Sequence, residues 1–208
     1  MAKNKPIIRL RGSEVLGKKV LILGEAGSGK TKIAAKLFQE LTALVNPEII
    51  TIVDMAPKRI NSVGGKMTDY VNMIGGVKYL SPEKVYTPRL SGTTAKEVLR
   101  YAELNRKAME PLLYEYIQNP TEVLLINDVT LYLQAGELEK ILKCIKLTKT
   151  FLATAYYGKK LVEDFGTGIS MREKMLTDKL ATFMDLVVKT DRLREMFTMR
   201  KITFGKSQ

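Results

Sequence analysis

The sequence predicts an α/β fold of three layers, in which a mainly parallel sheet is flanked by helices and carries an antiparallel hairpin at its C-terminal edge. Three aliphatic runs, at 19–23, 48–54 and 122–128, have the continuous apolar character of strands that are buried on both faces of a parallel sheet. Segments with helical periodicity separate these runs, which gives a βαβ pattern. A chain of 208 residues is long enough for one such domain, and we expect residues 1–208 to form one.

A glycine-rich motif follows the first aliphatic run. Residues 24–31 read Gly-Glu-Ala-Gly-Ser-Gly-Lys-Thr, a full match to the Walker A pattern, and residues 32–44 continue with helical spacing. A strand, a glycine loop and a helix in this order let backbone N–H groups and the helix N-terminus converge on one phosphate. The motif therefore predicts the P-loop NTPase fold and a bound nucleoside triphosphate.

This loop also predicts individual roles. Lys30 is expected to reach the β- and γ-phosphates and to take part in catalysis, while the Thr31 hydroxyl holds Mg²⁺. The sequence has no Asn-Lys-x-Asp guanine motif, so ATP is the expected nucleotide. The residues expected to bind it are Gly24, Glu25, Ala26, Gly27, Ser28, Gly29, Lys30, Thr31 and Lys32.

Two less regular segments flank the first βαβ unit. Residues 1–17 are expected to form a leading strand over 6–10 and a turn at 11–13. Residues 55–92 are rich in Pro and Gly and predict an irregular insertion near the nucleotide site, with a short helix over 70–74 and a short strand over 77–80. Its basic residues are candidate phosphate or partner contacts, namely Lys58, Arg59, Lys66, Lys84 and Arg89.

The alternation of helix and strand continues in the second half. Thr93 or Thr94 is expected to cap a long helix, with Glu97 as its capping-box partner, and Asn119-Pro120 ends that helix. The elements expected after the third aliphatic run are a helix over 137–146, a strand over 150–157, a loop over 158–170, a helix capped by Ser170 with Glu173 as its box partner, and two hairpin strands over 185–189 and 197–204.

Asp128 is the predicted acid of the metal site. It ends the third aliphatic run, which gives residues 122–128 the form of a Walker B strand. Because the carboxyl ends of parallel strands open onto the ligand crevice, Asp128 is placed to steady Mg²⁺ together with Thr31. We therefore expect Asp128 to be both a metal-site residue and a catalytic residue.

Composition limits the class of protein and its partners. The chain carries 34 Lys and Arg against 22 Asp and Glu, a net charge of +12, and no His. The basic residues are scattered, so this excess only weakly indicates nucleic-acid binding and also fits an acidic partner or the nucleotide itself. The single cysteine, Cys144, excludes an internal disulfide, and no apolar run approaches the length of a membrane span. We expect a cytoplasmic protein without membrane contact.

These elements together resemble the RecA-like ATPases, including the KaiC and RadB branches. The likeness rests on residues 24–31, on residues 124–131 (Leu-Leu-Ile-Asn-Asp-Val-Thr-Leu), and on the tail, where 185–189 and 199–206 are similar to a closing hairpin with a basic end. It extends from about residue 18 to the end, and the P-loop is its specific part. The resemblance implies an additional strand between the P-loop strand and the Walker B strand.

The sequence departs from this family at the catalytic position. Family members place a Glu just beyond the strand that follows the first helix, and Asp54, one methylene shorter, stands there in this chain and is our candidate. Asn127 precedes Asp128, and the Asp-Glu pair of AAA+ and FtsK-type motors is absent. The sensor position at the end of the next strand falls on Thr154 or Tyr156.

Three functions fit this sequence. The first is an ATPase whose hydrolysis drives a conformational change in a homo-oligomeric ring or filament, where a basic residue from a neighbour completes the site. The second is a P-loop kinase for a small molecule, and the third is a nucleotide-gated module with slow hydrolysis that binds DNA or a protein. The candidates for the neighbour's basic residue are Arg89, Arg192, Arg194, Arg200 and Lys201.

Overall fold

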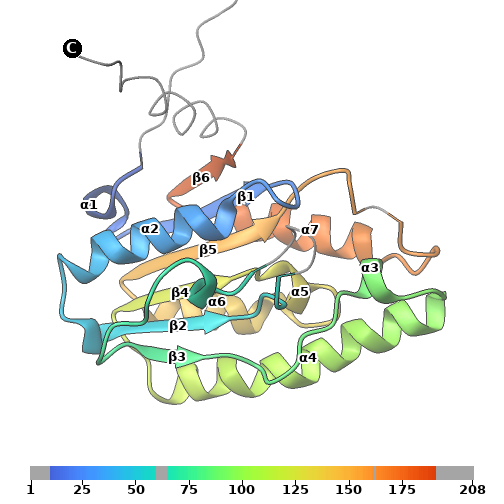
Figure 1. Cartoon of the computed structure of the whole chain (residues 1–208), viewed down its shortest axis with the longest axis horizontal. Coiled ribbons are helices and arrows are strands. Elements are labelled where there is room, and N and C mark those ends of the chain that lie inside the picture. The colour runs from blue at the N-terminus through green and yellow to red at the C-terminus, as the bar shows by residue number, and fades with distance from the viewer. Residues whose placement is uncertain (1–9, 60–64, 162, 191–208) are drawn as a thin grey trace, which may run out of the picture.

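Six parallel strands form the centre of the molecule. The computed structural model describes residues 10–59, 65–161 and 163–190. Within them the sheet has the order β3-β2-β4-β5-β1-β6 (Figure 1), and every paired strand in it is parallel to its neighbour. The strands are β1 (Lys19–Gly24), β2 (Ile50–Asp54), β3 (Lys78–Leu80), β4 (Val123–Asn127), β5 (Thr150–Tyr156) and β6 (Leu186–Lys189).

Helices cover both faces of this sheet, as the predicted three-layer fold requires. One face packs against α1 (Gly12–Val15) and α2 (Lys30–Thr42). The other packs against α4 (Ala95–Gln118), α5 (Thr130–Leu133), α6 (Leu138–Leu147) and α7 (Ile169–Ala181). Successive strand residues point to opposite faces, so that Ile22 belongs to the first core and Leu23 to the second.

The strand order decides where the functional residues meet. β5 lies between β1 and β4, with Leu21 opposite Ala153 and Leu124 opposite Phe151. The additional strand between the P-loop strand and the Walker B strand is therefore confirmed. Because the strands are parallel, the carboxyl ends of β1, β4 and β5 share one edge of the sheet, where a ligand crevice is expected.

The predicted antiparallel hairpin is not borne out. A strand does form near 185–189, but β6 pairs in parallel with β1, with Leu186 opposite Val20. Before β6, α7 carries the chain back along one face of the sheet, and a crossover of this kind leaves the flanking strands parallel. The second hairpin strand, predicted over 197–204, lies outside the described residues.

The N-terminal segment differs from its prediction as well. A short helix, α1, stands where a turn was expected at 11–13, and the Glu14 carboxylate accepts a hydrogen bond from the Arg11 N–H at 2.7 Å. Gly12 N–H donates to Glu40 of α2 at 2.6 Å, and a Cβ at Gly12 would lie 2.7 Å from the Cβ of Glu40. This close approach fixes α1 against α2. The predicted leading strand falls almost wholly on residues 1–9, outside the described residues.

The insertion over 55–92 is mostly irregular, as predicted. Its described part contains a 3₁₀ helix, η2 (Met67–Asp69), and a short helix, α3 (Pro88–Ser91), and the strand predicted over 77–80 is confirmed as β3. A second 3₁₀ helix, η1 (Pro47–Ile49), precedes β2. The helix predicted over 70–74 does not form, since η2 ends at Asp69 and residues 72–74 have no regular structure.

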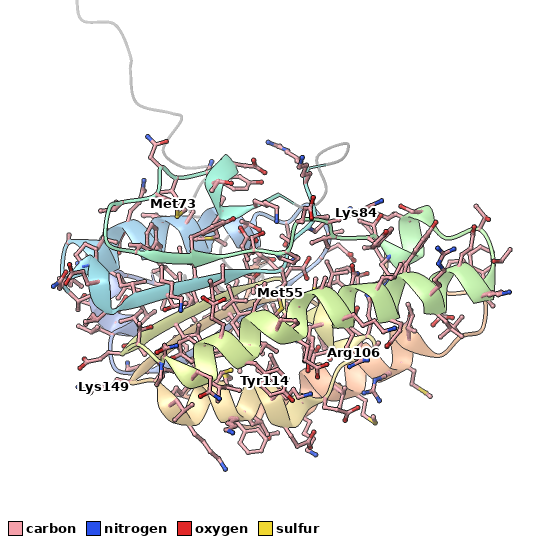
Figure 2. All side chains as sticks on the ribbon, turned by 90° about the horizontal axis from the view of Figure 1, so that it is seen from below. Met55, Met73, Lys84, Arg106, Tyr114 and Lys149 are labelled. Carbon is pink, nitrogen blue, oxygen red and sulfur yellow. The ribbon has the colours of Figure 1, made fainter. Side chains whose placement is uncertain are left out.

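The long helix α4 confirms the predicted cap and end, but Glu97 accepts from the N–H and the hydroxyl of Thr93, not from the Thr94 N–H as a capping box requires. Thr94 caps it, with the hydroxyl accepting from Glu97 N–H at 3.2 Å, and it ends before Pro120. Figure 2 shows Met55 between the sheet and this helix, which carries the labelled Arg106 and Tyr114. Met55 is fully buried in the core on that face of the sheet.

The other predicted elements of the second half form too, with one change at a helix start. α6 and β5 match the helix and strand expected over 137–146 and 150–157. The last helix is capped differently: Gly168, at φ 79°, is the N-cap of α7, and Asp164 rather than Ser170 supplies a side-chain acceptor, to the Ser170 N–H at 3.0 Å. None of the helices in the described ranges is both long and apolar enough to cross a membrane.

Candidate phosphate-binding site

The loop between β1 and α2 has the backbone shape that its glycines predict. Gly27 and Gly29 lie in the left-handed region, at φ 71° and 87°, and Gly29 is the N-cap of α2. Gly24 is required for another reason, because a Cβ there would lie 2.0 Å from the Thr190 hydroxyl oxygen. The loop is thus bent over the N-terminus of α2, which directs backbone donors to one place.

Lys30 lies inside this loop without a carboxylate partner among the described residues. Its ammonium donates to the backbone oxygens of Gly24 and Glu25, at 3.0 and 2.9 Å. Burial lowers the pKa of Lys30, an effect that the negative charge of Asp128 partly offsets. A buried ammonium that is hydrogen-bonded to carbonyl oxygens and forms no ion pair with a described carboxylate is suited to an incoming anion.

The P-loop borders a cavity of about 290 Å³ at the shared edge of the strands. Residues 26–32 form one wall of it. Asp128, Thr154 and Tyr156, at the ends of β4 and β5, form a second wall, and residues of the 55–92 insertion form a third. This arrangement of strand order, glycine loop and crevice decides the fold class. The chain has the P-loop NTPase fold.

Comparisons with known proteins add no closer identification. No family model matches the sequence, and no curated protein does. Similar solved structures include the flagellar accessory protein FlaH from Methanocaldococcus jannaschii, an ATPase from the type III secretion system of pathogenic bacteria, and the Pif1 helicase from Candida albicans. Their identities are 10, 11 and 12%, with TM-scores of 0.45, 0.41 and 0.36. The matches cover 83, 90 and 89% of this chain and 70, 54 and 40% of those chains. Such distant likeness carries no argument about function.

Asn127 connects the P-loop to the neighbouring strands. Its side-chain oxygen accepts from the hydroxyls of Thr31, at 3.2 Å, and Thr154, at 2.9 Å. Its amide nitrogen donates to Asp54 at 2.9 Å and to the Gly65 carbonyl at 3.2 Å. The sequence predicts that the Thr31 hydroxyl holds Mg²⁺ together with Asp128. In the structure this hydroxyl contacts Asn127, the residue immediately before Asp128.

Asp128 faces the cavity of about 290 Å³ beside the P-loop, which is called the phosphate cavity below after its candidate ligand. It follows β4 in the left-handed region, at φ 60°, and its N–H donates to the Thr154 hydroxyl at 2.8 Å. Its carboxylate accepts from the Thr130 hydroxyl at 2.7 Å. Burial raises the pKa of Asp128, against the lowering effects of that hydroxyl and of Lys30. Among the described residues that line the cavity it is the sole acid, so a carboxylate with a raised pKa stands opposite the P-loop.

Asp54 does not reach the cavity where a catalytic acid was expected. It is fully buried, and its first carboxylate oxygen accepts from Asn127 and from Ala56 N–H, at 2.9 and 3.2 Å. The second oxygen accepts from Met67 N–H at 2.6 Å and from the Tyr79 hydroxyl at 2.7 Å. Burial, followed by the charge of Asp54, raises the pKa of Tyr79. The structure thus places Asp54 where it joins the insertion to the sheet.

Glu25 holds the loop that follows β5 against the P-loop. Its carboxylate accepts backbone N–H donors from Ala26, Lys159 and Lys160, at 3.0, 2.7 and 3.3 Å. Burial acts to raise the pKa of Glu25, but these donors outweigh it and lower the value. A Cβ at Gly158 would lie 2.3 Å from this carboxylate. Glu25, predicted to bind nucleotide, therefore contacts the neighbouring loop with its side chain.

The basic residues of the insertion separate into two groups. Arg59 and Arg89 line the phosphate cavity. Lys66 instead donates to the Ala56 carbonyl and the Ser81 hydroxyl, at 3.1 and 2.6 Å, and Lys84 lies 4.6 Å from the centre of a tyrosine ring. Lys58 is exposed and does not line the cavity. Two of the five candidates thus line this cavity.

Sequence reasoning missed Glu173 and Gln134 as site residues. Glu173 is the buried partner of Arg89, and Gln134 donates to the same carboxylate at 2.7 Å. The sequence offered a capping role for Glu173, because it follows Ser170 at the spacing of a capping box. Arg89 and Glu173 are 84 residues apart, so no local pattern joins them.

Proposed function

We propose that this chain binds ATP with Mg²⁺ and hydrolyses it, and that hydrolysis is coupled to a conformational change or to the binding of a partner or nucleic acid. The observation that carries the proposal is the environment of Lys30. Its ammonium is buried in the glycine loop and donates hydrogen bonds to two backbone carbonyl oxygens. No described carboxylate forms an ion pair with this ammonium, and a triphosphate would supply the anionic partner.

Each residue of the P-loop has a place in this proposal. The backbone donors of residues 24–32 and the Lys30 ammonium bind the phosphates, and the positive charge offsets the charge that develops during transfer. Thr31 and Asp128 would hold Mg²⁺ together with phosphate oxygens and water, which would neutralise further charge. Asn127 orients Thr31.

Asp128 takes the role of base that Asp54 was expected to have. A base must lie within reach of the attacking water, and Asp128 lines the cavity while Asp54 does not. The same carboxylate would face both the metal and the water.

A kinase is the second candidate, and one observation favours it. A cavity of about 730 Å³ adjoins the P-loop on the side of α7 and shares Ser28, Arg89 and Tyr156 with the phosphate cavity. Its size is that of a small-molecule site. Lys174 and Lys189 line it, so an anionic phosphoryl acceptor would fit. The Asp128 carboxylate could activate either water or an acceptor hydroxyl, so phosphate release without an acceptor separates the two functions.

Phosphate release tests the proposal. We expect the wild type to release phosphate from Mg-ATP without an acceptor, and Lys30→Ala to lose that activity, while Lys18→Ala, an exposed lysine next to β1, keeps it. Assays with and without DNA, and over a range of protein concentrations, report the nucleic-acid and homo-oligomer parts of the proposal. Equal rates for the wild type and Lys30→Ala would contradict it, and release only with an added acceptor would favour the kinase.

A further inference from the structure

Arg89 and Glu173 form a buried ion pair at the edge of the phosphate cavity. Arg89 belongs to α3 and Glu173 to α7, and their side chains are 6% and 3% exposed. Arg89 Nη2 donates to both carboxylate oxygens, at 2.9 and 2.8 Å, and Nη1 donates to the Ser170 hydroxyl at 3.3 Å. Gln134 donates to one of the same oxygens at 2.7 Å. The carboxylate therefore fixes the direction of the guanidinium.

A buried ion pair contributes little net free energy to the packing of two helices. Removing two charges from water costs about as much free energy as their attraction contributes, and well-packed apolar side chains often stabilise a fold equally well. The burial of both charges is explained if the Arg89 guanidinium also binds a ligand. Arg89 lines the cavity that also contains Lys30 and Asp128, so a phosphate is the ligand within its reach.

Tyr156 links Arg89 to the P-loop lysine. The centre of its ring lies 5.0 Å from Arg89 Cζ and 6.0 Å from Lys30 Nζ, so both cations lie within cation–π range of one ring. A guanidinium has five N–H donors in a planar fork, a shape that matches phosphate oxygens. Glu173 and Ser170 engage two of its nitrogens, and the group retains donors for a further anion.

We propose that Arg89 binds the terminal phosphate of a nucleotide on the P-loop of its own chain, and that Glu173 positions it there. This rests on the proposed function, because it requires a triphosphate on Lys30. Two cations would then approach the terminal phosphate from different elements, Lys30 from α2 and Arg89 from α3, where both can stabilise developing charge. The sequence proposed Arg89 as a basic residue that a neighbouring subunit supplies, whereas here it acts within its own chain; the other four candidates for the neighbour's residue, Arg192, Arg194, Arg200 and Lys201, lie outside the described residues.

A charge-neutral double variant tests the contact without leaving a buried charge unpaired. Arg89→Gln with Glu173→Gln removes both charges and keeps a hydrogen-bonding amide at each position. We expect its affinity for ADP to stay within about twofold of the wild type, and its affinity for a non-hydrolysable ATP analogue to fall by about tenfold, as for the loss of one charge-assisted hydrogen bond. Calorimetric titration measures both affinities. The matched control is Arg106→Gln with Glu103→Gln, a partly exposed pair on α4 whose arginine also contacts Glu110, and it should change neither affinity.

Two single variants separate charge from shape. Arg89→Lys keeps the charge but loses the fork, so its affinity for the ATP analogue should fall several-fold while its affinity for ADP is kept. Glu173→Gln keeps an acceptor for Arg89 and removes only the carboxylate charge. These variants remain informative if the double variant does not fold.

The pH dependence of binding tests the role of Glu173. Three charged groups act on this carboxylate, namely Arg89, Asp128 and Lys30, and Gln134 is its neutral partner. Burial raises the pKa of Glu173 to about 7, against the lowering effect of Arg89. A phosphate beside Arg89 would raise it further, so binding would take up a proton. Relative to Glu173→Gln, the affinity of the wild type for the ATP analogue should fall about threefold or more from about pH 6 to about pH 8.

Each result decides between a phosphate contact and a purely structural pair. The proposal is overturned if the folded double variant keeps the wild-type ratio of analogue to ADP affinity, if it loses both affinities equally, or if the pH profiles of the wild type and Glu173→Gln are parallel. Failure of the wild type to bind either nucleotide is a different outcome, since it contradicts the proposed function itself.

Discussion

The Thr31 hydroxyl lies 3.2 Å from the side-chain oxygen of Asn127, which joins the first turn of α2 to the end of β4. The same Asn127 oxygen accepts from Thr154, and its amide donates to Asp54 and to the Gly65 carbonyl. Both acceptor sites and both donors of the amide are therefore used. One buried side chain joins the P-loop, the insertion and two strands.

We predict that Asn127→Ala lowers both stability and nucleotide affinity. It leaves Asp54 and Thr154 without one partner each, and a buried polar group without a partner costs about 1–3 kcal/mol. The midpoint of thermal unfolding should fall by roughly 5–10 °C for a loss of that size. Exposed Asn72→Ala is the control and should leave the midpoint unchanged. An unchanged midpoint for Asn127→Ala would show that the network does not stabilise the fold.

The contact between Glu25 and Gly158 predicts a non-additive pair of mutations. Gly158→Ala places a Cβ against the Glu25 carboxylate and should displace it from its backbone donors, at a cost of about 1–3 kcal/mol. In a Glu25→Ala background the same change meets no carboxylate and should cost little. Chemical denaturation of the four proteins measures this, with Gly75→Ala, which meets no atom within 4 Å, as the control. Equal costs in both backgrounds would contradict the predicted clash.

Glu173 predicts a pH dependence of stability. Its pKa is raised by burial from an ordinary value of 4.5 to about 7, so between these values the folded chain holds a proton that the unfolded chain releases. The free energy of unfolding should therefore fall as pH rises through this range, by roughly 3 kcal/mol. The measurement is chemical denaturation of the wild type and Glu173→Gln at several pH values. The loss with rising pH should be smaller in the variant by this amount, and parallel profiles would refute the raised pKa.

The different positions of Asp54 and Asp128 predict different kinetics. Asp128→Asn removes the carboxylate that faces the cavity, and the turnover number for ATP should fall by about 10²–10⁴-fold. Asp54→Asn weakens a buried network, so it should lower the unfolding midpoint while the folded protein keeps turnover within about tenfold. Steady-state rates corrected for the folded fraction separate the two. A larger kinetic loss for Asp54→Asn would return the role of base to that residue.

Much of the fold could be predicted from local patterns, because Gly24, Lys30 and Thr94 mark a loop, a helix start and a cap by their own chemistry. The direction of β6 could not, since its alternating burial suits an edge strand of either direction and its pairing depends on β1, far away in the chain. Asn127 and Asp128 are neighbours at the end of β4, and the backbone conformation there decides which of the two side chains contacts Thr31. The sequence pattern does not show that conformation, so it could not predict that Asn127 contacts the Thr31 hydroxyl.

Binding of Mg-ATP to the wild type and to Lys30→Ala is the most direct test of the central claim, that the glycine loop after β1 holds a triphosphate. Calorimetric titration should show one site per chain in the wild type. The affinity of Lys30→Ala should be lower by about 10–100-fold, as expected for loss of a charged hydrogen bond, with an unchanged unfolding midpoint. Equal affinities of the two proteins, or no binding by the folded wild type, would contradict the claim.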